Sequence, residues 1–442
     1  MSTEEADPAL VRRAIAASAV GNATEWFDYG VYAYVAVEIG DAFFPGEYST
    51  LATMLVFAVS FVLRPLGGVF WGALGDRIGR RSVLAGTILL MSVATFGVGV
   101  LPTVASIGVA APLLLIVLRM VQGFATGGEY GGAATFMAEY APDRRRGFLG
   151  SFLEVGTLSG FTLAIAVVAL TELAVGPDAM AAWGWRVPFL LGLPLGLVGL
   201  YLRARLEDTP VFRDLEEQGA PEGSRLRELL RDHRRPLLAL AGLVVALNVA
   251  NYTLITYTPT YLQETIGLGS GETDLLLAIG QGAMILVLPL AGAWSDRVGR
   301  KPLWWISLVG LFVLAIPMYL LMAQGFVGAL VGFSVLGLVY LLQLGTISSM
   351  FPAMFPTQVR YVGFATAYNV STAVFGGTAP ALSEGLIDAT GSNLVPAVVM
   401  MAGFVVGMVA LCFVPETRGC SLRGRETPIS GTAPARRSPR AP

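Results

Sequence analysis

Residues 72–81 read GALGDRIGRR, and residues 292–301 read GAWSDRVGRK. The second copy begins about 220 residues after the first, half the chain away, and both follow the second apolar run of their half. In each copy glycines permit a tight turn, and the aspartate can cap the next helix or pair with arginines. Making and breaking such pairs would bias the opening of two halves, although basic loop residues can also serve only to fix topology. The predicted gating residues are Gly72, Asp76, Arg77, Gly79, Arg80, Asp296, Arg297, Gly299 and Arg300.

The composition excludes a soluble globular fold. Of the 442 residues, 55% are hydrophobic and 14% charged, and the mean hydropathy is +0.67, whereas soluble proteins carry about 25% charged residues. Apolar runs of about 20 residues recur along the chain, and this is the length that a helix needs to cross a bilayer. The twelve runs lie at about 14–37, 51–75, 82–101, 111–138, 148–171, 186–203, 237–262, 273–294, 303–322, 327–350, 361–385 and 394–414.

We therefore predict an all-α membrane protein with twelve transmembrane helices in two pseudo-symmetric six-helix halves, surrounded by a lipid bilayer. The halves span residues 1–203 and 236–418. Residues 204–235 between them are polar and rich in arginine, which predicts a cytoplasmic linker. Residues 419–442 are rich in Pro, Ser and Arg, which predicts a disordered cytoplasmic tail.

Charge outside the runs is sorted by sign. Nearly all of the 29 Lys and Arg residues lie in the N-terminal tail, alternate loops or the C-terminal tail, and the remaining loops carry acids instead. Basic loops stay in the cytoplasm. We therefore expect both termini in the cytoplasm, an even number of spans, and a multi-pass location in the inner (plasma) membrane.

Other classes of function lack their motifs. The only histidine is His233, and the two cysteines, Cys412 and Cys420, lie near the C-terminal end, so no zinc-type cluster is expected. The sequence contains no GxxxxGK[ST] phosphate-binding loop and no nucleophile–base pattern. We expect no enzyme activity, no metal, no nucleic-acid partner, and no cofactor apart from a proton as coupling ion.

Several stretches give the chain a family resemblance. The two repeated loops resemble the cytoplasmic signature of the major facilitator superfamily. Other stretches resemble its metabolite:proton symporter family, and within it the proline/glycine-betaine transporters. The resemblance runs from about residue 12 to 418 and implies the major facilitator fold with alternating access. These stretches are GNATEWFDYGVYAY (21–34), RPLGGVFWG (64–72), QGFATGGEYGGA (122–133), AEYAPDRRRGFLGS (138–151), WGWRVPF (183–189), LEDTPVF (206–212) and PAMFPTQVRYVGFATAYNVS (352–371).

Two acids, Glu25 and Asp28, lie inside the first apolar run. A carboxylate near a helix centre costs about 2.5–3.5 kcal/mol on insertion scales unless it is protonated, paired or hydrated. The two acids share a helix face with Asn22 and Tyr32, which suits a water-filled cavity. Because burial favours the protonated acid, we predict that Glu25 and Asp28 bind the coupling proton. Pairing with basic residues at the N-terminal end of the run would instead give them a structural role.

Arg64 and Arg119 are the only basic residues deep within the runs. A buried arginine needs a carboxylate partner or an anionic ligand. Arg119 can hold Glu25, Asp28 or Glu129 in a pair that opens on protonation, or it can bind a substrate carboxylate, and the sequence leaves both open. We assign Arg119 and Glu129 to proton coupling with the two acids, and Arg64 to substrate binding.

The seventh run corresponds to the first run across the repeat, so the usual architecture of the family places the two opposite one another. Aromatic faces attract a quaternary ammonium by about 0.5–2 kcal/mol each, and asparagine amides can bind a carboxylate, so the pair suits a zwitterion. Aromatic belts at the membrane interface are the alternative reading of these rings. The predicted substrate-binding residues are Asn22, Trp26, Tyr29, Tyr32, Arg64, Asn248, Asn251, Tyr252 and Tyr257.

Together these features predict a proton-coupled secondary transporter that imports a small zwitterionic or acidic metabolite and functions as a monomer. Proline or glycine betaine is the first choice of substrate. Proton symport of citrate, a dicarboxylate or shikimate is the alternative. A membrane receptor or sensor is a third hypothesis, but it would be expected to carry a soluble output domain.

Overall fold

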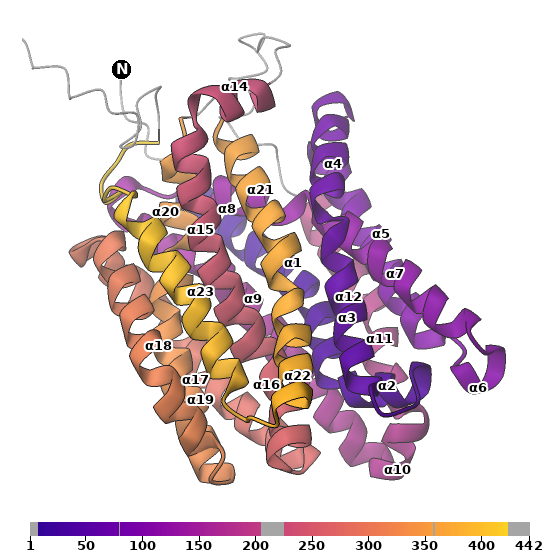
Figure 1. Ribbon diagram of the computed structural model, residues 1–442. Helices are drawn as coiled ribbons and strands as arrows, with labels where there is room; N and C mark the ends of the chain where they lie inside the picture. The colour runs from indigo at the N-terminus through magenta and orange to yellow at the C-terminus, as the bar shows by residue number, and fades with distance from the viewer. Residues whose placement is uncertain (1–7, 79, 205–224, 357–358, 423–442) are drawn as a thin grey trace, which may run out of the picture.

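The computed structural model describes residues 8–78, 80–204, 225–356 and 359–422. Within these ranges every regular element is a helix, and the helices run roughly side by side in an elongated bundle (Figure 1). The helix α14 (Arg225–Asp232) and the start of the described chain lie at one end, and α2 (Ala36–Phe43) and α6 (Val104–Ile107) lie toward the opposite end (Figure 1). We call the first of these the α14 end.

Six membrane segments form the first half. Several of them are built from consecutive helices that share one path through the bundle. They are α1 (Pro8–Tyr34), α3 (Ser49–Val62) with α4 (Arg64–Ile78), α5 (Arg80–Val100), α7 (Ala110–Thr126) with α8 (Glu129–Tyr140), α9 (Arg146–Val175), and α10 (Pro177–Ala179), η2 (Met180–Gly184), α11 (Arg186–Leu190) and α12 (Gly192–Ala204).

Six more segments follow α14 and repeat this plan. They are α15 (Arg234–Asn251) with η3 (Tyr252–Tyr257), α16 (Thr258–Thr260) and η4 (Tyr261–Ile266), then α17 (Ser270–Val298), α18 (Arg300–Met322), α19 (Phe326–Leu344) with α20 (Ile347–Met350), α21 (Arg360–Ser371) with η6 (Thr372–Gly376) and α22 (Thr378–Thr390), and α23 (Val395–Cys412). The predicted all-α fold of two six-helix halves is confirmed.

Eight of these segments are long and apolar enough, as helices, to cross a membrane, and a pair bent by 47° within residues 177–201 makes a ninth. The predicted runs missed the internal breaks. Leu63 ends α3 because Pro65 in the next turn has no N–H to continue the hydrogen-bond ladder. Residues 252–257 form a π-helix, a form that often marks functional sites.

Glycines set how closely the helices pack in the first half. A methyl group on Gly156 or Gly160 of α9 would fall 2.2 or 2.4 Å from a backbone oxygen of α1. On Gly123 of α7 it would fall 1.5 Å from the backbone oxygen of Ser60 in α3. These contacts are possible only without a side chain, so they fix α1 against α9 and α3 against α7.

The two halves contact one another along the bundle. Near its middle, Gln281 Nε2 of α17 donates a hydrogen bond to Tyr34 Oη of α1 over 2.8 Å. Toward the end opposite α14, Ser270 Oγ donates to Glu172 Oε1 over 2.6 Å. Hydrogen bonds therefore join the two halves both near the middle of the bundle and toward the end opposite α14.

Candidate functional site

Asp28 and Arg119 form a buried ion pair between α1 and α7. Asp28 Oδ2 lies 3.4 Å from Arg119 Nη1, and both side chains are at most 3% exposed. Arg119 also sits over the ring of Tyr32, with its guanidinium carbon 4.2 Å from the ring centroid. Of the partners that the sequence left open for Arg119, the structure brings Asp28 to it.

Two residues that the sequence analysis missed complete the surroundings of Asp28. Thr95 Oγ1 of α5 and Gln122 Nε2 of α7 donate to Asp28 Oδ1 over 2.6 and 2.7 Å. Gln122 Oε1 in turn accepts from Arg119 Nη1 over 2.8 Å. The carboxylate is therefore held by one cation and two neutral donors. Gln122 lies one helical turn after Arg119, and this spacing was the available signal.

Glu25 and Arg64 form a second, looser pair. Arg64 Nη2 lies 3.7 Å from Glu25 Oε1, and the arginine is 1% exposed. Among the described residues, none of the three guanidinium nitrogens of Arg64 has a hydrogen-bond partner. The guanidinium instead faces the rings of Phe61 and Tyr29, 5.6 and 6.0 Å from their centroids. A buried cation with open donors is a candidate receptor for an anionic group.

A small cavity joins three of the predicted coupling acids. It has a volume of about 10 Å³ and is lined by Glu25, Asp28 and Glu129, together with Thr95. This is about the space of a single water molecule. Glu129, at the start of α8, is 2% exposed. The acids therefore line a small cavity inside the first half and do not lie on the outer surface.

Two predicted substrate-binding residues serve packing within the first half. Asn22 Nδ2 donates to Leu153 O and Thr157 Oγ1 of α9 over 2.9 and 2.6 Å. Tyr32 Oη donates to Thr53 O of α3 over 3.1 Å. Both side chains have their hydrogen bonds satisfied away from the interface between the halves.

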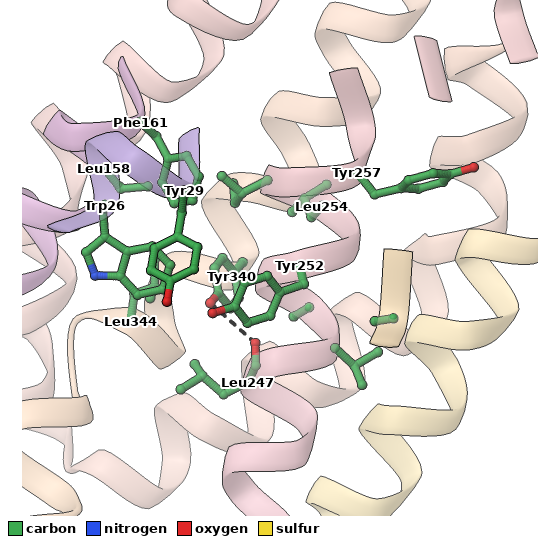
Figure 2. Packing of buried hydrophobic residues seen from close by; sticks show 14 of the residues in the cluster. Trp26, Tyr29, Leu158, Phe161, Leu247, Tyr252, Leu254, Tyr257, Tyr340 and Leu344 are labelled. Atoms are coloured by element: carbon green, nitrogen blue, oxygen red, sulfur yellow. Dashed lines mark hydrogen bonds between the residues drawn. The ribbon is translucent and has the colours of Figure 1, made fainter. Parts of the chain in front are cut away.

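Trp26 and Tyr29 of the first half meet Tyr252 of the second. The ring centroids of Trp26 and Tyr29 lie 5.6 Å apart, and those of Trp26 and Tyr252 lie 6.3 Å apart. Figure 2 shows Trp26 and Tyr29 directed toward Tyr252 and Tyr340. Among the described residues, Trp26 Nε1 and Tyr252 Oη are buried without a hydrogen-bond partner. The predicted aromatic meeting of the first and seventh segments is therefore present at the interface.

The other predicted residues of the seventh segment face elsewhere. Tyr257 Oη donates to Glu384 of α22, and Figure 2 places Tyr257 apart from the aromatic cluster. Asn248 Nδ2 donates to Thr372 Oγ1 over 2.9 Å. Asn251 Oδ1 accepts from Tyr340 Oη over 3.3 Å. These hydrogen bonds stay within the second half, and that of Asn251 joins it to Tyr340 of the aromatic cluster.

The second copy of the repeated loop bridges the halves at the α14 end. The carboxylate of Asp296 accepts from the backbone amides of Gly147 and Phe148 over 2.8 and 2.9 Å, at the N-terminus of α9. Arg300 Nη2 lies 2.7 Å from Asp296 Oδ1. Gly299 has a φ of +115°, a backbone conformation that favours glycine and turns the chain between α17 and α18. A carboxylate at a helix N-terminus is stabilised by the amides and the dipole there.

The first copy of the loop is only partly described. Gly79 lies outside the described residues. The backbone at Gly72, Asp76, Arg77 and Arg80 is helical, and their side chains are not among those described. Their predicted gating role stays a prediction.

Residues after α23 contact both halves at the α14 end. Arg146 Nη1 of the first half donates to Cys420 O, and Arg360 Nη2 of the second half donates to Leu422 O, each over 2.8 Å. Arg418 donates to the backbone oxygen of Arg297 in the repeated loop. These contacts fall at the start of the predicted tail, of which residues 423–442 lie outside the described residues.

Comparison with known proteins decides the family. Residues 18–379 match the sequence profile of the Major Facilitator Superfamily. The chain belongs to the Major Facilitator Superfamily. Among solved structures with a similar fold is the proton:xylose symporter XylE, with a TM-score of 0.76 over 94% of this chain and 98% of that one, at 18% sequence identity.

Three curated relatives of this major facilitator protein are each 42% identical to it. The glycine betaine/proline/ectoine/pipecolic acid transporter OusA of Dickeya dadantii aligns over 97% of this chain and 88% of its own length. The proline/betaine transporter of Escherichia coli K12 aligns over 95% and 86%. The ectoine/proline transporter ProP of Corynebacterium glutamicum aligns over 94% and 86%.

The predicted resemblance is thus confirmed, and the major facilitator protein is a membrane-embedded secondary transporter of a small molecule, not an enzyme. Its fold places the two ion pairs and the small cavity within the first half, and the aromatic contact at the interface between the halves.

Proposed function

We propose that this chain is a proton-coupled symporter that imports a small zwitterion, proline or glycine betaine, by alternating access. The observation that carries the proposal is Arg64. Its guanidinium is fully buried, and among the described residues its three nitrogens lack hydrogen-bond partners. A substrate carboxylate would supply the missing acceptors in the two-pronged geometry that arginine favours.

The aromatic side chains around Arg64 suit the other end of such a substrate. Tyr29 lies beside the guanidinium, and the ring of Phe61 lies 5.1 Å from that of Tyr252. Aromatic faces attract an ammonium group carrying several alkyl substituents by about 0.5–2 kcal/mol each. The unpartnered Tyr252 hydroxyl and Trp26 ring N–H lie in the same cluster. A carboxylate and an alkylated ammonium within one small molecule match this combination.

Charge balance favours a zwitterion over citrate or a dicarboxylate. Each of the two arginines at the proposed site already has one carboxylate beside it, Glu25 for Arg64 and Asp28 for Arg119. Among the described residues these two arginines are the cations at the site, and a di- or trianion would bring further negative charge. A zwitterion brings none. The names of the curated relatives support the same substrate class.

The Asp28–Arg119 pair supports proton coupling. Protonation of Asp28 removes the charge that holds Arg119, so the pair loosens when the proton arrives and tightens when it leaves. Entry of one proton yields about 2.3 kcal/mol per 100 mV of membrane potential, which can drive uptake of a neutral solute against its gradient. Glu25 and Glu129 line the same cavity and are positioned to take part.

We assign the α14 end to the cytoplasm because basic residues gather there. They come from the repeated loop and from η1 (Asp143–Arg145), which precedes α9. Asp296 then acts as part of a cytoplasmic gate. Its hydrogen bonds to the start of α9 hold the halves together at that end and must break when the site opens inward.

The proposal is tested with purified protein in proteoliposomes under an imposed pH gradient, acid outside. Uptake of labelled proline, glycine betaine and citrate is compared for the wild type, Arg64→Gln and the exposed control Arg145→Gln. We expect uphill accumulation of proline or betaine by the wild type and the control. For R64Q we expect the substrate KM to rise at least tenfold, about 1.4 kcal/mol.

Two results would refute the proposal. Accumulation of citrate without proline or betaine would replace the substrate class. Accumulation that is insensitive to the pH gradient and to a protonophore would remove proton coupling. Separately, an unchanged KM in R64Q would show that the substrate carboxylate does not bind to Arg64.

A further inference from the structure

Glu154 is a buried carboxyl that the sequence analysis did not assign. It lies on α9 and is 2% exposed. Tyr130 Oη of α8 donates to Glu154 Oε1, and Thr157 Oγ1 donates to Glu154 Oε2 over 3.0 Å. Both partners are neutral hydroxyl groups.

Glu154 differs in this respect from the two acids of α1. Glu25 has Arg64 beside it and Asp28 has Arg119. Within the described part of the chain, Glu154 forms no salt bridge. A carboxylate buried in a membrane protein without a cation is unfavourable, and it is relieved by taking up a proton. The same two contacts are compatible with a neutral acid that has taken up one further proton, since its carbonyl oxygen can accept from one hydroxyl while its own O–H donates to the other.

No element packed against this part of α9 supplies a compensating positive charge among the described residues. The titratable groups within electrostatic reach are phenols: Tyr130 on α8, Tyr340 on α19 and Tyr368 on α21. Helix α1 contributes the amide of Asn22, which donates to Thr157. Helix α17 contributes Asp296, whose carboxylate is bound near residue 147 at the start of α9.

The hydrogen-bonded partner of Glu154 also crosses the interface between the halves. The rings of Tyr130 and Tyr368 are stacked, with centroids 4.5 Å apart and planes inclined by 20°. Tyr130 belongs to the first half and Tyr368 to the second. Movement of the halves must therefore separate or slide this stack, and it changes the surroundings of the hydroxyl that contacts Glu154.

The chain of contacts also reaches α1. Thr157 Oγ1 donates to Glu154 and accepts from Asn22 Nδ2. Asn22 lies one turn before Glu25 on the same helix face. Tyr368, on the other side of the stack, is within electrostatic reach of both Arg64 and Glu25. Glu154 is thus linked to the proposed substrate site from two directions.

We propose that Glu154 is a second proton-binding site of the transport cycle, so that one proton travels on Glu154 in addition to the one handled by Asp28. This inference rests on the proposed function. The carboxyl is protonated in the closed arrangement described here. When the halves part at the cytoplasmic end and the Tyr130–Tyr368 stack opens, the O–H bond of Glu154 breaks and the proton passes to water on that side.

The test measures how many protons accompany each substrate molecule. Wild type, Glu154→Gln, Glu154→Asp and the control Glu384→Gln are reconstituted in proteoliposomes. Glu384 is a matched control because it is also buried and accepts from a tyrosine, Tyr257, but away from the interface. The proton-to-substrate ratio is obtained from the membrane potential and pH gradient at which net flux of labelled betaine or proline reverses. Exchange of labelled for unlabelled substrate at equal pH reports folding and binding.

We expect E154Q to keep exchange and to lose one proton per substrate, E154D to regain it, and E384Q to keep the wild-type ratio. An unchanged ratio in E154Q with normal exchange overturns the proposal. Should E154Q lose exchange as well, Tyr130→Phe decides, since it keeps the carboxyl and removes its donor. A changed pH dependence of uptake in Y130F supports proton binding at Glu154, and a profile that superimposes on the wild type overturns it. Failure of the wild type to accumulate either substrate would instead count against the proposed function.

Discussion

Asp28 and Arg119 are 91 residues apart in the chain, yet their charged atoms lie 3.4 Å apart between α1 and α7. The pair is buried and is supported by donors from Thr95 and Gln122. Since a buried pair is a poor means of stabilising a protein, its place beside a small cavity that Glu25 and Glu129 also line favours a role in which the pair opens.

Replacing Asp28 by Asn should separate coupling from transport. The amide cannot bind or release a proton, so we expect accumulation to fall well below that of the wild type while exchange and membrane insertion persist. The measurement is uptake and exchange in proteoliposomes. Asp178→Asn, at an exposed site, is the matched control. Uphill uptake by D28N equal to that of the wild type would contradict the coupling role.

Asp296→Asn should weaken the gate at the α14 end. The substitution removes the charge that two amides of α9 and Arg300 share. Charged hydrogen bonds contribute about 1.5–3 kcal/mol, so we expect the balance between states to shift about tenfold or more toward opening at that end. Labelling of a cysteine introduced at the interface should become faster from that side.

Turnover by D296N should also slow, with little change in substrate affinity. The exposed Asp388→Asn serves as the control. Unaltered labelling and turnover would argue that Asp296 only caps α9.

Gly123→Ala should destabilise the first half. The added methyl group would lie 1.5 Å from the backbone oxygen of Ser60, so α3 and α7 must move apart. Overpacking of this kind costs about 1–3 kcal/mol. We expect a lower unfolding temperature in detergent. Gly282→Ala is the control, because a methyl group there would meet nothing within 4 Å. Equal unfolding temperatures for both variants would mean that the helices adjust freely.

Glu38 provides a pH-dependent test outside the predicted first span. Burial raises the pKa of Glu38 from 4.5 to about 7, and the negative charges of Glu172, Asp41 and Glu264 add to this, while its own backbone hydrogen bond opposes it. A raised pKa means that the folded state binds this proton more tightly. The resulting stability is present below the ordinary pKa of 4.5 and is lost as the pH rises through about 7.

The variant Glu38→Gln cannot ionise. We therefore expect it to unfold at a higher temperature than the wild type at pH 8 and at nearly the same temperature at about pH 5. Thermal unfolding in detergent at both pH values is the measurement, with the exposed Glu47→Gln as control. A difference of equal size at both pH values would exclude ionisation of Glu38 as its cause.

The charged residues of the site could be predicted from the sequence, but their contacts could not. Glu25, Asp28, Arg64 and Arg119 were identifiable because a charge inside an apolar run is costly and therefore selected for a purpose. Which acid pairs with which arginine could not be predicted, since it depends on which faces of α1, α4 and α7 meet. Thr95 escaped notice because a hydroxyl in a membrane helix carries no such cost. A hydroxyl can donate within its own helix turn, as Thr95 does to Met91 O, and so leaves no pattern in the sequence.

The last test separates the two tyrosines that the sequence grouped together. Tyr252 and Tyr257 begin and end a π-helix, in which the angle between successive side chains differs from that of a regular α-helix. Tyr252 meets Trp26 and Phe61 across the interface, whereas Tyr257 contacts Glu384. We expect Tyr252→Ala to raise the KM for betaine at least fivefold, about 1 kcal/mol, through lost aromatic contact. Tyr257→Ala should leave the KM within twofold while lowering stability. A larger rise in KM for Tyr257→Ala than for Tyr252→Ala would place the substrate beside α22 and away from Arg64.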